Sequence, residues 1–146
     1  MDTGNYSKDV HKQSRLWLQK IMGDLEGGTL DLDLYNDFQT ELKDHIFEEE
    51  TFIFKMFKEN GKLKNEILGL ETEHAAMWRL TNLINSEIET KRFQKIEKYF
   101  DELFRILTQH NEREEQLIYS NLADSIHVAA KRPQDWVCKK LKSYFN

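Results

Sequence analysis

Two stretches of this sequence repeat one pattern, and that repeat limits the fold more than any other feature. One begins at His45 and the other at His110, and both read H-x-x-x-E-E-x-x-I-[F/Y]-x-x-[F/L], which places Glu49 and Glu114 four residues after the histidines. Residues four apart on an α-helix lie on one face, one turn from each other. Each stretch therefore presents an imidazole and a carboxylate to the same point, and the chain must hold two such helices face to face.

The spacing of apolar residues predicts an all-α fold. They recur every three or four residues with no sustained alternation, and Gly (six) and Pro (one) are scarce. We expect long helices over residues 7–26, 33–59, 63–89 and 91–125, the first capped by Ser7 after a loose arm over residues 1–6. A short helix over 133–144 should begin at Pro133. Because the connections are short, the fold should be an antiparallel up-down-up-down four-helix bundle.

Length, charge and cysteine content narrow the class of protein. The 146 residues suit one domain (1–146, with the bundle over 7–125 and the C-terminal helix over 133–144). A net charge of −5 argues against nucleic-acid or anionic-membrane partners. There is no apolar run of membrane-spanning length and no secretory pattern, and the single cysteine, Cys138, cannot form an internal disulfide. We therefore expect a cytoplasmic protein whose protein partner is unknown.

The predicted core stripes carry an unusual number of polar residues. The second helix, for example, should bury Phe38, Leu42, His45, Glu49, Phe52 and Met56. One histidine lies on the core stripe of each long helix, and two of the helices add a carboxylate. These six residues are His11, His45, Glu49, His74, His110 and Glu114. Buried polar groups cost free energy unless they are satisfied, so something must satisfy all six together.

Counting residues from each side chain to the nearest helix end tests whether the six converge. Counted to the connection that joins their helices, His11 is 15 residues away and His45 is 13, so the two should lie at nearly the same height in the bundle. Glu49 and His74 are 10 and 11 residues from theirs and should also lie at one height. His74 and His110 differ by four residues, which is about 6 Å at the rise of an α-helix and is small enough for loop geometry to absorb. All six side chains can thus form one layer across the bundle.

The chain also has internal symmetry that suits a two-metal site. His11 and His74 are 63 residues apart, and His45 and His110 are 65 apart. Each half therefore supplies an early histidine and a later H-x-x-x-E. Two imidazoles per ion with bridging carboxylates, without thiolate, favour iron, then manganese, with zinc as a further substitute.

At these residues the sequence resembles the hemerythrin-like (HHE cation-binding) family over about residues 10–124. The resemblance implies a non-haem di-iron centre bridged by Glu49, Glu114 and an oxo or hydroxo group. Family members carry or sense O2, store or sense iron, or protect against nitric oxide. Oxygen carriers have a second histidine four residues after the one on the third helix, where this chain has Trp78. They also often place the bridging acid five residues after the last histidine, so Glu115 is a reserve candidate for Glu114.

Several alternatives remain open. Glu71 with His74 forms a single E-x-x-H, the ferritin-like ligand pattern. The remaining acids near the motifs are expected to form a solvated face, with the alternative that one of them is a seventh ligand or steers cations, and His127 is expected on the surface. The acids in question are Glu48, Glu50, Glu112 and Glu115.

Three functions fit the pattern. The first is a di-iron protein, more a binding or sensing protein than an enzyme, whose partner is O2, a related diatomic or iron itself. The second is a di-iron enzyme or repair protein that acts on nitric oxide or peroxide, or delivers iron to damaged clusters. The third is a helical interaction bundle without metal.

Overall fold

The computed structural model describes residues 3–122 and 130–145, and this part of the chain contains helices and no strand. The long helices are α1 (Thr3–Glu26), α2 (Leu32–Glu48), α4 (Lys64–Glu89) and α5 (Ile96–Leu117). A π-helical turn, η1 (Glu49–Ile53), joins α2 to α3 (Phe54–Glu59). A 3-10 turn, η2 (Tyr119–Asn121), follows α5, and α6 (Leu141–Phe145) lies near the C-terminus.

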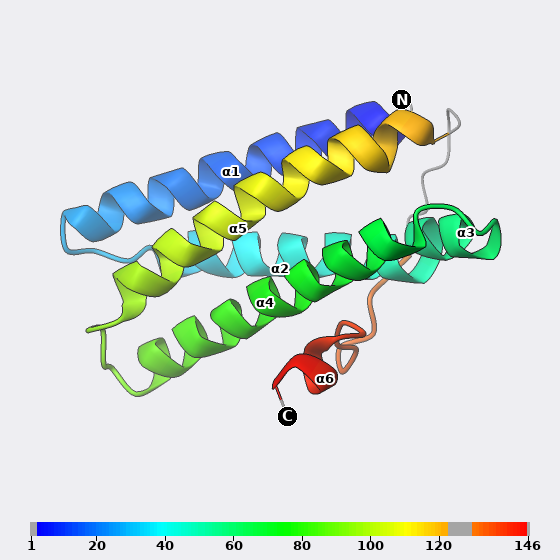
Figure 1. Ribbon diagram of the computed structural model, residues 1–146. Helices are drawn as coiled ribbons and strands as arrows, with labels where there is room; N and C mark the ends of the chain where they lie inside the picture. Colours follow the sequence, from blue (N-terminus) through cyan, green and yellow to red (C-terminus); the bar gives the residue numbers. More distant parts are fainter. Residues whose placement is uncertain (1–2, 123–129, 146) are drawn as a thin grey trace.

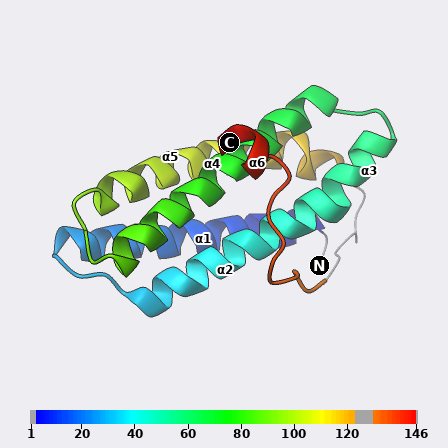
Figure 2. The ribbon, with the colours of Figure 1, turned by 90° about the horizontal axis from the view of Figure 1, so that it is seen from below.

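The long helices pack into a bundle. Helix α1 contacts α2 and α5, and α4 contacts α5 and α2, which closes a ring of neighbours. Figures 1 and 2 show the four long helices side by side, with their connections at the two ends. The short α6 packs outside this ring against α4. None of the helices in the described residues is long and apolar enough to cross a membrane.

The first helix starts earlier than predicted. Helix α1 begins at Thr3, so Ser7 lies inside it and is not its N-cap, and residues 3–6 are not a loose arm. These residues contain no proline, and extending an existing helix costs little. The second helix starts close to the predicted position, where Leu34 N donates to Asp31 Oδ1 at 3.0 Å as an N-cap.

The start of the last long helix corrects the predicted register. Helix α5 begins at Ile96 rather than near residue 91, because Lys91 adopts a left-handed conformation (φ 55°) that ends the preceding helix. Fourteen residues then separate Ile96 from His110, and fifteen separate His74 from Glu89. The expected offset of one turn between these two histidines therefore disappears. Helix α5 ends at Leu117, and Ser125, the predicted end, lies outside the described residues.

The C-terminal helix is shorter than predicted. It begins at Leu141 and not at Pro133, because the segment from residue 130 to 140 runs across the bundle in turns and irregular structure. The ring of Trp136 anchors that segment by packing edge-on against Phe47 (5.1 Å between centroids) and Trp78 (5.7 Å). Cys138 is buried, at 1 % exposure.

The π-turn shifts the buried face of the second helical rod by one residue. In this turn Phe54 N donates to Glu49 O, five residues earlier instead of four. Up to Glu49 the buried residues follow the predicted stripe, but beyond it Ile53 and Phe57 are buried where Phe52 and Met56 were expected. The extra residue turns the rest of the helix, so the predicted stripe is wrong after Glu49.

The polar layer lies between two apolar clusters. Along α2, α4 and α5 the predicted ligands separate a large cluster, which includes Phe38, Ile84 and Phe100, from a small one. The small cluster consists of Ile53, Phe54, Phe57, Ile67, Leu70, Ile118 and Tyr119. Packed apolar side chains on both sides hold the polar residues in place and keep bulk water from the layer.

Candidate metal centre

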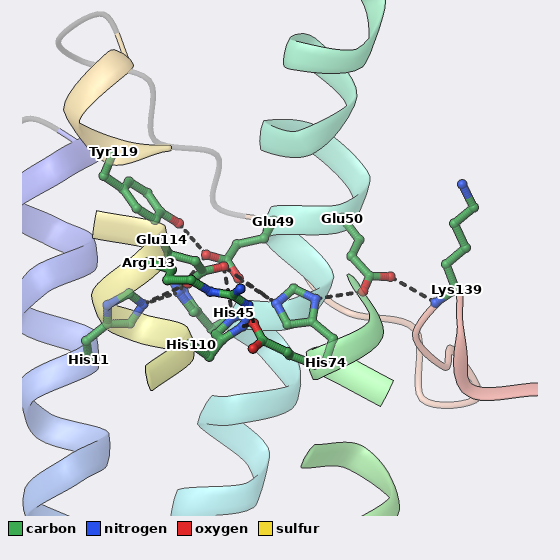
Figure 3. A network of polar contacts seen from close by, with 11 residues as sticks. His11, His45, Glu49, Glu50, His74, His110, Arg113, Glu114, Tyr119 and Lys139 are labelled. Atoms are coloured by element: carbon green, nitrogen blue, oxygen red, sulfur yellow. Dashed lines mark hydrogen bonds and ion pairs between the residues drawn. The ribbon is translucent and has the colours of Figure 1, made fainter. Parts of the chain in front are cut away.

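The structure brings all six predicted side chains together in one layer (Figure 3). They form two groups that share both carboxylates, one with His11 and His45 and the other with His74 and His110. Within each group the four potential ligand atoms lie within 4.8 Å of one another. Glu49, His74 and Glu114 are fully buried, and the most exposed of the six, His45, is only 11 % exposed.

The Glu49 carboxylate divides its oxygen atoms between the two histidine pairs. Its Oε2 lies 3.2 Å from His45 Nε2, and its Oε1 lies 3.0 Å from His74 Nε2. One oxygen therefore faces each half of the site, which is the geometry of a carboxylate that bridges two cations.

Glu114 repeats this arrangement from the other side. Its Oε1 lies 3.2 Å from His11 Nε2, and its Oε2 lies 3.1 Å from His110 Nε2 and 3.6 Å from His74 Nε2. Both oxygens are buried, and neither makes a hydrogen bond with the part of the chain that the structure describes. A buried carboxylate is costly unless positive groups compensate its charge, and here either the surrounding histidines in their protonated form or a bound cation can do so.

The histidines point the same nitrogen inward. The Nε2 atoms of His11 and His45 lie 3.1 Å apart, and both face the shared carboxylates. Two adjacent ligands at about 2.1 Å from one ion at right angles to each other lie about 3 Å apart. The residues present therefore fit two cations, each held by two imidazole nitrogens and one oxygen from each carboxylate.

Comparison with protein families agrees with this geometry. The sequence model of the hemerythrin HHE cation-binding domain matches residues 8–122, which is most of the chain.

The chain belongs to the hemerythrin family.

No curated protein and no solved structure matches the chain. The family of this hemerythrin domain is thus shown by the family model, and its candidate metal site is identified from the positions of its own side chains. The family description establishes cation binding, and it leaves the ion and its use open.

The hemerythrin domain surrounds its histidines with further carboxylates. Glu50 Oε2 lies 2.7 Å from His74 Nδ1, and Glu73 Oε1 lies 2.9 Å from His110 Nδ1. Glu115 Oε1 lies 3.5 Å from His11 Nδ1. Carboxylates behind ligand imidazoles fix the ring and its tautomer, and they make the imidazole a stronger donor. The Glu50 side chain is only 4 % exposed, so Glu50 is not part of the solvated face that the sequence predicted. Glu115 is 32 % exposed, and Glu112 is exposed as predicted.

The acids and histidines control each other's protonation. Burial lowers the pKa of His45, but the Glu49 carboxylate outweighs burial and raises that pKa to about 9. Acidic neighbours likewise raise the pKa of His74 well above its ordinary value and raise the pKa of His110. Burial raises the pKa of Glu114, but His110 and the other histidines outweigh burial and hold that pKa well below its ordinary value. Without metal, the layer is a network of charged pairs.

Other residues considered from the sequence lie apart from the two groups. Glu71 is buried, but its carboxylate pairs with Lys58 Nζ at 2.7 Å, so the ferritin-like pattern does not assemble. Trp78 packs against Trp136. Glu114, and not Glu115, belongs to both groups. His127 lies outside the described residues.

The sequence analysis identified neither Tyr119 nor Glu73 as a residue of the site. Tyr119 is 5 % exposed, and its hydroxyl donates a hydrogen bond of 2.7 Å to Glu49 Oε2. The repeated E-E-x-x-I-[F/Y] pattern could have indicated the position of Tyr119, because it places this residue five positions after Glu114, on the helical face next to the site.

Proposed function

We propose that this hemerythrin domain binds two iron ions, bridged by Glu49, Glu114 and an oxo or hydroxo group. We further propose that the centre binds or senses O2, a related diatomic, or iron. One observation carries the proposal: each buried carboxylate offers one oxygen to the His11–His45 pair and the other to the His74–His110 pair. The proposed scaffold is an antiparallel up-down-up-down bundle, supported by the ring of contacts among α1, α2, α4 and α5.

The donor set favours iron. It combines imidazole nitrogen with carboxylate oxygen, and Cys138 lies outside both groups. Such mixed donors, with room for more than four ligands per ion, suit iron and then manganese better than structural zinc. Manganese and zinc are the expected substitutes when iron is scarce.

Four histidines, with Trp78 at the position of a further one, leave each ion two imidazoles and two carboxylate oxygens. Iron in such a site supplies binding or one-electron reduction of a small molecule at its remaining positions. This favours sensing or reaction over simple reversible carriage.

The deciding experiment is anaerobic purification with ferrous iron, followed by a metal count and visible spectra before and after air is admitted. Two irons per chain, with near-ultraviolet and visible bands that appear on oxidation, are expected. His45→Ala and His110→Ala each remove a ligand from one group and should lower the metal content, whereas Glu112→Gln, which changes an exposed acid nearby, should not. Full metal content in both alanine variants would falsify the assignment.

The second candidate is a di-iron enzyme or repair protein that acts on peroxide or nitric oxide, or that delivers iron. The buried Tyr119 hydroxyl favours it, because a proton donor stands 2.7 Å from the bridging carboxylate. Steady-state turnover of peroxide or nitric oxide by the reduced protein would support this candidate. Metal-loaded protein that shows no turnover of either would leave the binding role.

The third candidate, a bundle that functions without metal, makes the opposite prediction for stability. A cation that binds only the folded chain adds stability by mass action. Chelation should therefore lower Tm if the first proposal holds and leave Tm unchanged if the bundle works without metal.

A further inference from the structure

The two halves of the site differ where the sequence repeat differs. Five residues after Glu49 the chain has Phe54, and five residues after Glu114 it has Tyr119. The Phe54 ring stacks on His74, with centroids 5.5 Å apart and planes 8° apart. The Tyr119 hydroxyl instead donates its hydrogen bond to Glu49 Oε2, the oxygen that faces His45. Only one of the two Glu49 oxygens is therefore shared with a hydroxyl.

The surroundings of the outer histidine nitrogens, the Nδ1 atoms, also differ between the two halves of the site. His74 Nδ1 and His110 Nδ1 each face a carboxylate, at 2.7 and 2.9 Å. In the other half, His45 Nδ1 is buried and has no hydrogen-bond partner in the described ranges, and His11 Nδ1 lies 3.5 Å from Glu115 Oε1, which is farther than either carboxylate contact of the first half. A carboxylate behind a ligand imidazole strengthens its bond to a cation, so the better-supported ligands belong to the His74–His110 half.

We propose that the two cation positions differ in affinity, so that the position between His74 and His110 retains its ion while the one between His11 and His45 releases its ion first. This inference rests on the proposed function. Both observations act in one direction: Glu50 and Glu73 strengthen the donors of one half, and Tyr119 withdraws electron density from the Glu49 oxygen of the other. Carboxylates of this kind typically change metal affinity by about 10- to 100-fold.

The consequence is a stable half-loaded form. With one ion bound at His74 and His110, the domain can exchange its second ion with the surrounding pool. Such an exchangeable position suits iron sensing or iron delivery better than it suits a permanently loaded centre.

Release kinetics test the proposal on the full chain. Protein loaded anaerobically with two ferrous ions is mixed with excess of a coloured ferrous chelator, and the colour is followed with time. Two phases of one ion each are expected, with rates that differ by about tenfold or more. A single phase that releases both ions would overturn the proposal and leave the two-iron function standing. Protein that never loads two ions would overturn the proposed function itself.

Substitutions assign the phases to the halves. Glu73→Gln keeps the side-chain size but removes the charge behind His110, so it should accelerate the slow phase alone. Glu73 is 24 % exposed and also pairs with Arg113, so the variant should fold. Glu112→Gln, an exposed acid two residues after His110, is the matched control and should change neither phase.

Tyr119→Phe gives the complementary readout. Removing the hydroxyl returns Glu49 Oε2 wholly to the ion, so the fast phase should slow while the slow phase stays unchanged. Mössbauer spectra of the iron-57 protein should show two distinct iron signals that become more alike in this variant, which a change in packing alone would not produce. If Glu73→Gln accelerated only the fast phase, the assignment of the halves would be wrong.

Discussion

At the scale of single residues, two consecutive glutamates hold one histidine from both sides. Glu49 Oε1 lies 3.0 Å from His74 Nε2, and Glu50 Oε2 lies 2.7 Å from His74 Nδ1. Consecutive helical residues project in different directions, so both can reach one ring only if that ring lies between them. The rotation of the His74 ring is therefore fixed before any cation binds, which lowers the reorganisation that binding requires.

The raised histidine pKa values predict the pH dependence of the metal-free protein. A histidine whose folded pKa exceeds its ordinary 6.5 contributes stability that is present below pH 6.5 and is lost as pH rises through the folded pKa, about 9 for His45. A carboxylate with a depressed pKa, such as Glu114, contributes stability above its ordinary 4.5 that is lost as pH falls. The Tm of protein stripped of metal should therefore peak between about pH 4.5 and 6.5.

Bound metal should reverse the pH dependence of Tm above about pH 6. Cations bind neutral imidazole, so binding near neutral pH must release protons from His45 and its neighbours. Calorimetric titration in buffers of different ionisation enthalpy should detect this release, and the Tm of loaded protein should increase from about pH 6 to pH 8. Binding without proton release at pH 7 would show that these histidines do not lose protons when the cation binds, which would contradict their role as ligands.

At the scale of elements, the π-turn η1 supplies one residue more than a regular helix needs. It separates the stripe that ends at Glu49 from the buried Ile53 and Phe57. The turn lies where Glu49 points into the site and Glu50 reaches the outer nitrogen of His74. Such turns are frequent at functional sites, because they re-aim side chains without breaking the helix.

Two single-residue deletions test that reading of η1. Deleting Thr51 should let the rod continue as an α-helix with Ile53 and Phe57 on the regular stripe, so the chain should still fold. Deleting Thr40, an exposed threonine within α2, should rotate buried Tyr35 and Phe38 out of the core and cost more than about 4 kcal/mol. Circular dichroism melts compare the two, and equal loss of structure would show that η1 holds no surplus residue.

A buried hydroxyl connects α2 to α4. Tyr35 is fully buried, and its hydroxyl donates to Asn85 Oδ1 at 2.9 Å and to Thr81 O at 3.2 Å. Tyr35→Phe should lower the unfolding free energy by about 1–3 kcal/mol, because buried acceptors lose a donor. Metal content should be unchanged, since Tyr35 is not in either ligand group. Urea unfolding measures the free energy and a metal count measures the content, and loss of metal would indicate coupling between this contact and the site.

At the scale of the whole molecule, the C-terminal segment closes over the acid behind His74. Lys139 N donates to Glu50 Oε1 at 2.9 Å, while the other Glu50 oxygen faces His74 (Figure 3). Trp136 anchors the same segment, and Cys138 is buried beneath it. The C-terminal segment thus contacts the site through Glu50.

Cys138 reports whether that segment is docked. Burial raises the pKa of its thiol from 9.0 to about 12, so the reactive thiolate is about 1,000-fold scarcer than in an ordinary cysteine. Alkylation at pH 8 should be slow in the native protein and much faster in Trp136→Ala, with the helical content retained. A native rate equal to that of unfolded protein would mean that the segment does not stay docked.

The sequence predicted which six polar side chains would come together, because one periodicity governs their positions. His11, His45, His74, His110 and the two carboxylates lie on regular α-helical stripes, and helices joined by short connections bring such stripes together. The same reasoning failed after Glu49, because a π-turn has no distinct residue pattern and the apolar run from Phe52 to Phe57 fits either register. Helix ends near Lys91 and Pro133 depended on backbone conformation that single residues do not specify.

The outer contacts of the site could not be predicted. Glu50, Glu73 and Glu115 resemble surface acids in sequence, and only their distances to the histidine Nδ1 atoms separate them from exposed Glu112. Which carboxylate approaches which ring depends on the rotation of each helix about its axis. Periodicity defines the buried face of a helix but does not fix that rotation to within one hydrogen bond.

The order of the ligands along the chain has a consequence for how the protein is made. His11 emerges first from the ribosome, and Glu114 follows 103 residues later. At about 5–20 residues per second, the first ligand waits on the order of ten seconds for the last. Because each cation position requires Glu114, a growing chain cannot assemble either one. Under the proposed function, cation capture must therefore follow synthesis of the last long helix, so truncated products would carry no complete site.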